Sequence, residues 1–213
     1  MYDAKDIILF IVPLLFAVIL HEVAHGWVAE KLGDPTARLL GRITLNPIPH
    51  IDLIGTIILP GLLLRIGSPF LFGWAKPVPV NFGNLRGGRR DMALVALSGP
   101  LTNFILAILS SIVFHLTLSP TDPWALFSRI SVPLHLMASF SVQFNIVLMV
   151  INLLPILPLD GGRIVAGLAP LPVALAMQRL ERYGMLIVLL LIASGMWGYI
   201  VRPFVHFFRQ VLM

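Results

Sequence analysis

Residues 6–31 read DIILFIVPLLFAVILHEVAHGWVAEK, and they are the most informative part of the chain. This apolar stretch is long enough for a helix that crosses about 30 Å of hydrocarbon, which takes roughly 20 residues. Its second half nevertheless contains His21, Glu22 and His25. Ionisable side chains at that depth are costly unless a metal ion, a partner or a water-filled cavity compensates them. We therefore predict a membrane helix that carries a functional site.

Composition extends this prediction to the whole chain. Of the 213 residues, 58% are hydrophobic and 12% are charged, which is outside the range of ordinary soluble domains. Further apolar runs cover residues 51–66, 92–118, 132–154, 164–177 and 183–201. We predict an all-α polytopic membrane protein with about five to six membrane helices or re-entrant segments. Residues 1–213 are expected to form a single domain in the lipid bilayer.

The net charge of +5 does not call for a nucleic-acid partner, because the basic residues cluster in short loops between apolar runs. Such clusters are typical of the cytoplasmic face of membrane proteins. If the clusters at residues 31–42 and 86–90 share that face, residues 51–66 must enter and leave on one side. A re-entrant loop satisfies this condition, and the sequence also leaves a full span open.

Residues 72–82, FGWAKPVPVNF, have a different pattern from the apolar runs. Large apolar side chains alternate with Lys76 and with two prolines. This alternation favours an exposed strand or a loose hairpin, because proline is tolerated at the edge of a sheet and not inside a helix. We predict a small β-hairpin here.

The sequence HEVAH at residues 21–25 has the spacing of a metal-binding helix. Positions four residues apart lie on one helical face, so both imidazoles can share one ion and Glu22 can reach a metal-bound water. The chain has no cysteine, so histidine and carboxylate must hold any metal. The alternative is that these polar groups only pack helices together.

Zinc needs a third protein ligand and keeps its fourth position for water. Asp160 is the best candidate, because it follows an apolar run and precedes Gly161-Gly162, where the backbone can turn sharply and approach closely. The alternative role for Asp160 is a helix N-cap for the segment that begins near Arg163. Asp34 and Asp52 are competing carboxylates, but both lie in the basic loop region.

Asn103 and Asn152 are polar residues in apolar helices. Asn103 and Asn152 could each donate a hydrogen bond to a substrate carbonyl or backbone, and the alternative is hydrogen bonding between helices. For Asn103 we weigh the two roles equally, and for Asn152 we favour function because Asp160 follows eight residues later. His50 could line the entrance to the site. The other histidines are expected to be interfacial or structural: His115, His135 and His206.

Three motifs together resemble the site-2 proteases, the intramembrane zinc metalloproteases of regulated proteolysis. These are HEVAH at 21–25, SGPLTN at 98–103 and NLLPILPLDGG at 152–162, in the order of that family and within a core of about residues 6–163. The resemblance implies that His21, His25 and Asp160 bind Zn²⁺. It implies that Glu22 is the catalytic acid and base and that Asn152 helps to stabilise the transition state. GWAKPVPVN at 73–81 is similar to the family's membrane-associated β-hairpin, which is thought to present substrate.

The resemblance implies hydrolysis of peptide bonds in or near the transmembrane segments of single-span membrane proteins. The chain is similar to the minimal prokaryotic branch without PDZ or CBS domains, so we expect a multi-pass protein of the plasma membrane. The main alternative is a metal-ion transporter or channel that uses the same His/Asp cluster, although no paired repeat is visible. An inactive membrane scaffold is a third reading. The residues indicate neither the substrate's identity nor an oligomeric state.

Overall fold

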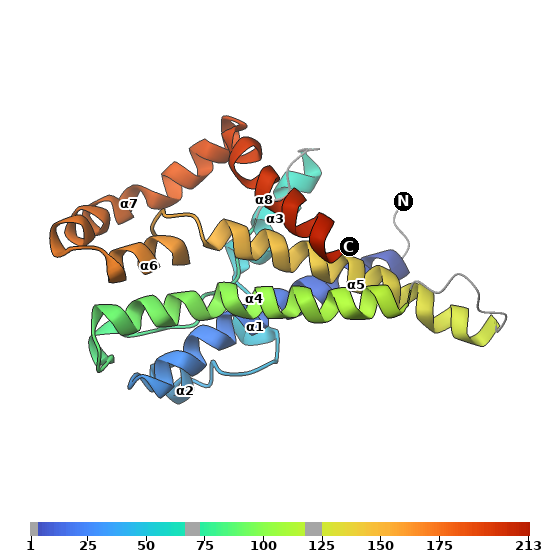
Figure 1. The fold of residues 1–213 in the computed structure, drawn as a ribbon, viewed down its shortest axis with the longest axis horizontal. Coiled ribbons are helices and arrows are strands. Elements are labelled where there is room, and N and C mark those ends of the chain that lie inside the picture. The colour runs from blue at the N-terminus through green and yellow to red at the C-terminus, as the bar shows by residue number, and fades with distance from the viewer. Residues whose placement is uncertain (1–3, 67–72, 118–124) are drawn as a thin grey trace.

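The structure is a computed structural model that describes residues 4–66, 73–117 and 125–213. Three long helices lie along one another in Figure 1: α1 (Ala4–Lys31), α4 (Arg89–Leu116) and α5 (Ala125–Asn152). Within the described residues, these are the helices that are long and apolar enough to cross a membrane, over Ile8–Lys31, Arg89–Leu116 and Ile130–Asn152. The expected helical membrane architecture is therefore confirmed.

Helix α4 is the centre of this bundle, and it packs against α1, α5 and α6 (Asp160–Leu168). Its inward positions are occupied by small residues, including Ala93, Ala96, Gly99 and Ala107. Its exposed positions carry large apolar side chains, including Leu94, Leu101, Ile105, Leu109 and Ile112. Membrane helices show this arrangement because lipid accepts apolar side chains and small residues let backbones approach closely.

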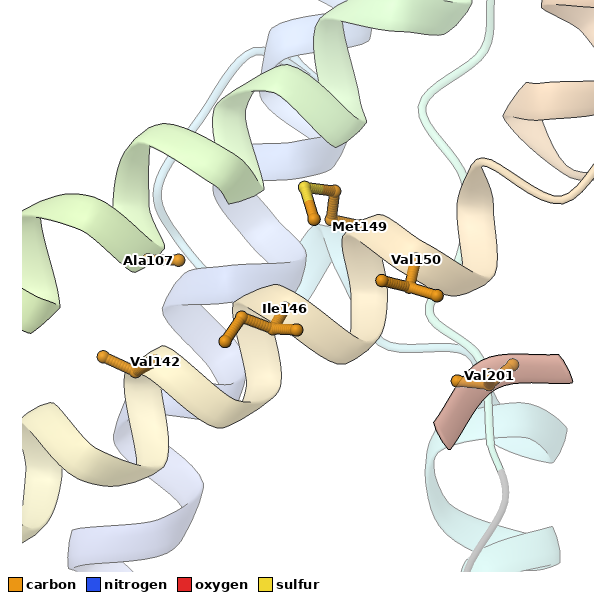
Figure 2. Close-up of a cluster of buried hydrophobic side chains, with 6 residues drawn as sticks. All are labelled: Ala107, Val142, Ile146, Met149, Val150 and Val201. Atoms are coloured by element: carbon orange, nitrogen blue, oxygen red, sulfur yellow. The ribbon is translucent and has the colours of Figure 1, made fainter. Parts of the chain in front are cut away.

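Helix α8 (Met196–Leu212) packs against α5 and, less extensively, against α4. Figure 2 shows the apolar cluster that joins it to the long helices. The buried members are Ala107 from α4, Val142, Ile146, Met149 and Val150 from α5, and Val201 from α8. This cluster fixes the position of α5, whose last residue begins the loop that leads to Asp160.

Between α1 and α4, the described residues 32–66 and 73–88 form short elements only. These are α2 (Thr36–Leu39), the 3₁₀ turn η1 (Ile48–His50), the π-helical η2 (Leu53–Ile58), α3 (Leu59–Arg65) and the 3₁₀ turn η3 (Phe82–Asn84). The apolar helical stretch Leu53–Leu63 is shorter than a membrane-spanning helix. The expected count of five to six membrane segments is thus not supported by the described residues.

The hairpin predicted near residues 72–82 is not formed in the part of the chain that the structure describes, from Gly73 onward. Residues 73–81 are extended but have no partner strand. Pro77 and Pro79 have no N–H group to donate to a partner strand. Two further N–H groups of the segment donate to carboxylates, Val78 to Glu22 and Asn81 to Asp34. The segment is therefore fastened to α1 and the loop that follows it.

The last predicted span, at 183–201, is wrong as a single helix. Helix α7 (Leu171–Ala193) ends before Gly195, which has a left-handed φ of +74°, and α8 begins after it. A residue without a Cβ adopts that conformation freely, so the chain can change direction there. Figure 1 shows α7 and α8 as the two arms of a sharp bend.

Candidate metal centre

The three residues predicted as metal ligands meet at one point. His21 and His25 lie one turn apart on α1, and their Nε2 atoms are 3.1 Å from each other. Asp160 is the first residue of α6, and its Oδ2 lies 3.1 Å from Nε2 of His21 and 3.3 Å from Nε2 of His25. Between 8% and 12% of each side chain is exposed. A helical pair and a distant carboxylate thus form one buried group.

Helix α4 orients both imidazoles from behind. Nδ1 of His21 is 2.6 Å from Oδ1 of Asn103, and Nδ1 of His25 is 2.8 Å from the carbonyl oxygen of Val95. Ser98 adds a longer contact, with its Oγ 3.4 Å from Nδ1 of His25. A carbonyl oxygen can only accept, so each Nδ1 carries the hydrogen. The lone pair of each neutral ring is then on Nε2, the atom that faces the centre.

The atoms that face one another at this point are all acceptors in that arrangement. Oδ2 of Asp160 is buried and has no hydrogen-bond donor among the described residues. Two ring lone pairs and a carboxylate oxygen this close are unfavourable unless a cation lies among them. Two imidazoles and one carboxylate are a donor set of catalytic zinc sites, which keep a further position for water or substrate. The side chains therefore fit Zn²⁺.

Gly99 leaves the space that this group occupies. A Cβ at that position would lie 2.4 Å from Nε2 of His25 and 2.6 Å from Nε2 of His21. The backbone of α4 consequently passes directly against both rings, and a side chain there would fill the space beside both Nε2 atoms.

Two glycines allow Asp160 to reach the centre. A Cβ on Gly161 would lie 2.3 Å from the carbonyl oxygen of Leu153, and one on Gly162 would lie 2.4 Å from the backbone nitrogen of Leu157. The loop after α5 can fold over the start of α6 only because these side chains are absent. Asp160 makes no capping hydrogen bond, and the N-cap position is Leu159. The alternative role of Asp160 as an N-cap is therefore wrong.

Glu22 lies beside the imidazoles at the wall of a cleft of about 290 Å³. Its Oε2 accepts a 2.7 Å hydrogen bond from the backbone N–H of Val78. The cleft is lined by residues of the extended segment and by residues of the loop after α5 and the start of α6. The first group is Pro77, Val78, Val80 and Phe82, and the second is Asn152, Pro158, Leu159, Asp160 and Arg163. A substrate in this cleft would touch Glu22 and the metal group together.

The two predicted asparagines differ in position. Asn152 lines the cleft, and its Nδ2 donates to the carbonyl oxygen of Leu148 in the same helix. Asn103 is fully buried behind His21 and makes hydrogen bonds between helices, as its structural alternative proposes. A direct role in catalysis stays a prediction for both residues.

The two competing carboxylates, Asp34 and Asp52, do not line the cleft, and neither does His50. Asp34 accepts hydrogen bonds from Thr36, Asn81 and Asn84, and Asp52 caps η2 by accepting from Ile54 and Gly55. His50 is buried, its Nε2 lies 3.0 Å from the carbonyl oxygen of Thr44, and its own carbonyl oxygen accepts from Lys76 N–H. His50 therefore supports the start of the extended segment, and it is not among the residues that line the cleft.

Sequence reasoning missed two residues of the site. Asn145, on α5, accepts a 2.8 Å hydrogen bond from Nδ2 of Asn103. Arg163 lines the cleft, with its guanidinium carbon 4.9 Å from the ring centre of Phe82 and one nitrogen 3.5 Å from a carboxylate oxygen of Glu181. The available signal for Asn145 was a second polar amide, besides Asn152, in the apolar run 132–154. No comparable pattern marks Arg163.

Comparison with known proteins gives relatives over almost the whole chain. The Bacillus subtilis (strain 168) protein named "Putative zinc metalloprotease YwhC" is 37% identical over 203 residues, which is 95% of this chain and 88% of that protein. "Putative zinc metalloprotease Rip2" of Mycolicibacterium smegmatis is 29% identical over 88% of this chain and 67% of its own length. Rip2 of Mycobacterium tuberculosis (strain H37Rv) is 31% identical over 72% of this chain and 54% of its own length.

No protein-family model matches the chain, and no solved structure gives a significant match. The relatives, the three motifs and the buried His/His/Asp group agree with one another. The chain belongs to the site-2 protease family of zinc metalloproteases.

Proposed function

We propose that this protein is a zinc metalloprotease that hydrolyses peptide bonds in or near the transmembrane segments of other membrane proteins. The observation that carries the proposal is the meeting of His21, His25 and Asp160 beside Glu22, inside a helix that can cross a membrane. The metalloprotease names of the relatives support the same chemistry.

The reaction divides between the metal and Glu22. Zinc, when bound, polarises the substrate carbonyl and activates a water molecule for attack. Glu22 takes the proton of that water on its free carboxylate oxygen, since Oε2 already accepts from Val78. Glu22 then passes this proton to the departing amine. Asn152, which lines the same cleft, is proposed to donate a hydrogen bond to the carbonyl oxygen as negative charge develops there.

The depth of the group favours substrates that are themselves in the membrane. The HEVAH segment belongs to the span Ile8–Lys31, and the surrounding helices expose large apolar side chains. Water and substrate must therefore reach the cleft inside the bilayer region. We place the protein in a prokaryotic plasma membrane as a multi-pass protein, with single-span membrane proteins as its substrates.

A substrate helix must be unwound locally before its peptide bonds can react, because they are already hydrogen-bonded within the helix. Residues 73–81 are extended and border the cleft through Pro77, Val78 and Val80. Pairing of this segment with an extended stretch of substrate would replace helical hydrogen bonds by strand ones. Val80→Pro removes one backbone donor and leaves the bond from Val78 to Glu22 in place. Slower cleavage of helical substrates with unchanged zinc content is expected, and unchanged cleavage would contradict the pairing.

The test of the main proposal uses the full chain in lipid nanodiscs with single-span model substrates. Wild-type protein should bind about one zinc ion and cleave, cleavage should stop with chelator, and added zinc should restore it. Glu22→Gln keeps a side chain of the same size but cannot act as a base. It should retain zinc and lose at least about 100-fold in cleavage rate, the usual scale for a general base.

A zinc-flux measurement in proteoliposomes separates this function from transport. A protease whose Glu22 is a base should show no zinc flux in either form. Retained flux in Glu22→Gln, together with no cleavage by wild-type protein on any single-span substrate, would overturn the proposal in favour of a transporter.

A further inference from the structure

The hydrogen bonds behind His21 continue through all three long helices. His21 of α1 contacts Asn103 of α4 at 2.6 Å, and Nδ2 of Asn103 donates to Oδ1 of Asn145 of α5 at 2.8 Å. Nδ2 of Asn145 then donates to the carbonyl oxygen of Ser141 at 2.8 Å. Asn103 and Asn145 are 0% and 1% exposed, so water does not compete for these bonds. A chain of directed hydrogen bonds thus ends on a predicted metal ligand.

The direction of each bond matters because an amide side chain has two different ends. With its oxygen toward His21, Asn103 stabilises the ring with hydrogen on Nδ1 and a free lone pair on Nε2. With its NH₂ group toward His21, it would stabilise the opposite tautomer, in which Nε2 carries the hydrogen and cannot bind a metal. The orientation of Asn103 therefore determines whether His21 is ready for zinc.

Two acceptors hold Asn103 in the productive orientation. Its NH₂ group donates to the carbonyl oxygen of Ala17 at 3.1 Å and to Oδ1 of Asn145. Asn145 is itself fixed, because its own NH₂ group faces the carbonyl oxygen of Ser141, which can only accept. A reversed Asn103 would place its oxygen against two other oxygens. The Ser141 carbonyl thus sets the direction of the hydrogen bonds that run from Asn145 through Asn103 to His21.

His25 has no such dependence. Its Nδ1 faces the backbone carbonyl oxygen of Val95, which cannot reverse. Of the two imidazoles, only His21 relies on a side chain whose orientation must be set by another side chain.

We propose that Asn145 is a positioning residue, which acts through Asn103 to keep the hydrogen of His21 on Nδ1 and its Nε2 free for zinc. This inference rests on the proposed zinc site. Partners of this kind behind a metal-bound histidine typically change metal affinity by about 10- to 100-fold when they are removed. Asn145 is one bond further away, so we expect an effect of about 10-fold, at the lower end of that range.

Three variants of the full chain test the proposal. Asn145→Leu has a similar size and removes the acceptor for Asn103. Asn145→Asp keeps an oxygen facing Asn103 and loses the donation to Ser141. Gln143→Leu is the matched control, because Gln143 lies on the same helix and, among the described residues, donates within that helix to Oγ of Ser139. Each is compared with wild-type protein in nanodiscs.

Two measurements avoid any dependence on cleavage. Zinc affinity is obtained by competition with a chromogenic chelator. The tautomer of His21 is read from the ¹⁵N chemical shifts of its ring in metal-free protein. Asn145→Leu should bind zinc about 10-fold more weakly and show a second His21 tautomer, while Asn145→Asp and Gln143→Leu should stay close to wild type in both readings.

The outcomes separate the two proposals. If Asn145→Leu lowers thermal stability but leaves zinc affinity and the His21 shifts unchanged, Asn145 is only a link between helices and the inference is overturned. An equal loss of zinc affinity in Asn145→Leu and Asn145→Asp would also overturn the inference, because the oxygen at position 145 that accepts from Asn103 would then have no effect. If wild-type protein binds zinc but cleaves nothing, the proposed function fails while the tautomer measurement still decides the role of Asn145.

Discussion

The backbone N–H of Val78 donates a 2.7 Å hydrogen bond to the carboxylate of Glu22. The extended segment and the proposed catalytic base are therefore directly connected. Hydrogen bonds to a carboxylate are shorter and stronger than those between neutral groups, so this bond fixes which oxygen of Glu22 remains available. The position of the segment and the orientation of the base should change together.

Replacing Val78 by proline tests this connection. Val78→Pro removes the donor and keeps an extended backbone, whereas Val78→Ala keeps the N–H and removes only side-chain packing. A hydrogen bond to a charged group contributes about 1.5–3 kcal/mol, so Val78→Pro should lower kcat by roughly 10- to 100-fold if the bond holds Glu22 in place in the transition state. Zinc content should not change in either variant. A larger rate loss in Val78→Ala would contradict a role for the N–H.

Gly99→Ala should abolish zinc binding. The added Cβ would lie 2.4 Å from Nε2 of His25 and 2.6 Å from Nε2 of His21, where the ion is expected. Gly61→Ala, in α3, is the control because a Cβ there meets no atom within 4 Å. Zinc stoichiometry measured by elemental analysis decides the point, and a Gly99→Ala protein with a full complement of zinc would mean that the metal lies elsewhere.

Asp160→Asn should separate metal binding from stability. Oδ2 of Asp160 lacks a donor partner among the described residues and faces two ring nitrogens. An asparagine at this position can turn its NH₂ group toward them and remove the repulsion. We expect the metal-free variant to unfold at the same temperature as metal-free wild type or higher. Zinc should raise Tm of the wild-type protein only, since a ligand stabilises the state that binds it.

The comparison needs both proteins with chelator and with zinc, by thermal unfolding in the same detergent. A clear loss of stability in metal-free Asp160→Asn would show that the carboxylate has a structural partner. An equal rise of Tm with zinc in both proteins would argue against Asp160 as a ligand.

Asp34 lies beyond the membrane-spanning part of α1, and it should make the free energy of unfolding depend on pH. Burial tends to raise the pKa of this carboxyl, but hydrogen bonds from Thr36, Asn84 and the backbone N–H of Asn81 outweigh it, so the pKa is lowered. A carboxyl with a lowered pKa in the folded state stabilises the fold above the ordinary value of about 3.9. That stabilisation is lost as the pH falls through the lowered folded-state pKa.

Asp34→Asn should therefore lower the free energy of unfolding near neutral pH by about 1–3 kcal/mol, because one of the groups that donate to Asp34 would lose its acceptor. The free energy of unfolding of the variant should also fall less than that of wild type as the pH is lowered. Asp91→Asn is the control, since Asp91 needs only one oxygen for the N–H of Gly87. Thermal unfolding of metal-free protein across acid pH measures both effects, and parallel pH profiles for wild type and Asp34→Asn would exclude the assigned role.

The metal group could be predicted from the sequence because its geometry is mostly local. The spacing of four positions from His21 to His25 fixes their common face on any helix. Gly161-Gly162 marks the close approach that Asp160 needs, and the structure shows what those glycines avoid. The apolar runs likewise predict α1, α4 and α5, because long hydrophobic stretches have few alternatives to a helix in lipid.

The remaining features depend on contacts between distant segments. The alternation in residues 72–82 resembles a strand, but carboxylates of Glu22 and Asp34 accept the N–H groups that a hairpin would use. The break between α7 and α8 at Gly195 could not be predicted from the apolar run at 183–201, because hydropathy carries no information about backbone conformation. Asn145 matters only because Asn103 lies opposite it, and no pattern along the chain indicates that pairing.

The two imidazoles and the carboxylate opposite them are supplied by distant parts of the chain, the second half of α1 and the first residue of α6. A nascent polypeptide that has inserted α1 alone would therefore hold two of the three predicted ligands. Hydrolytic power would arise only after α5 has left the ribosome and the loop has folded back. In the proposed protease, a chain that is still being made would therefore not cleave other membrane proteins.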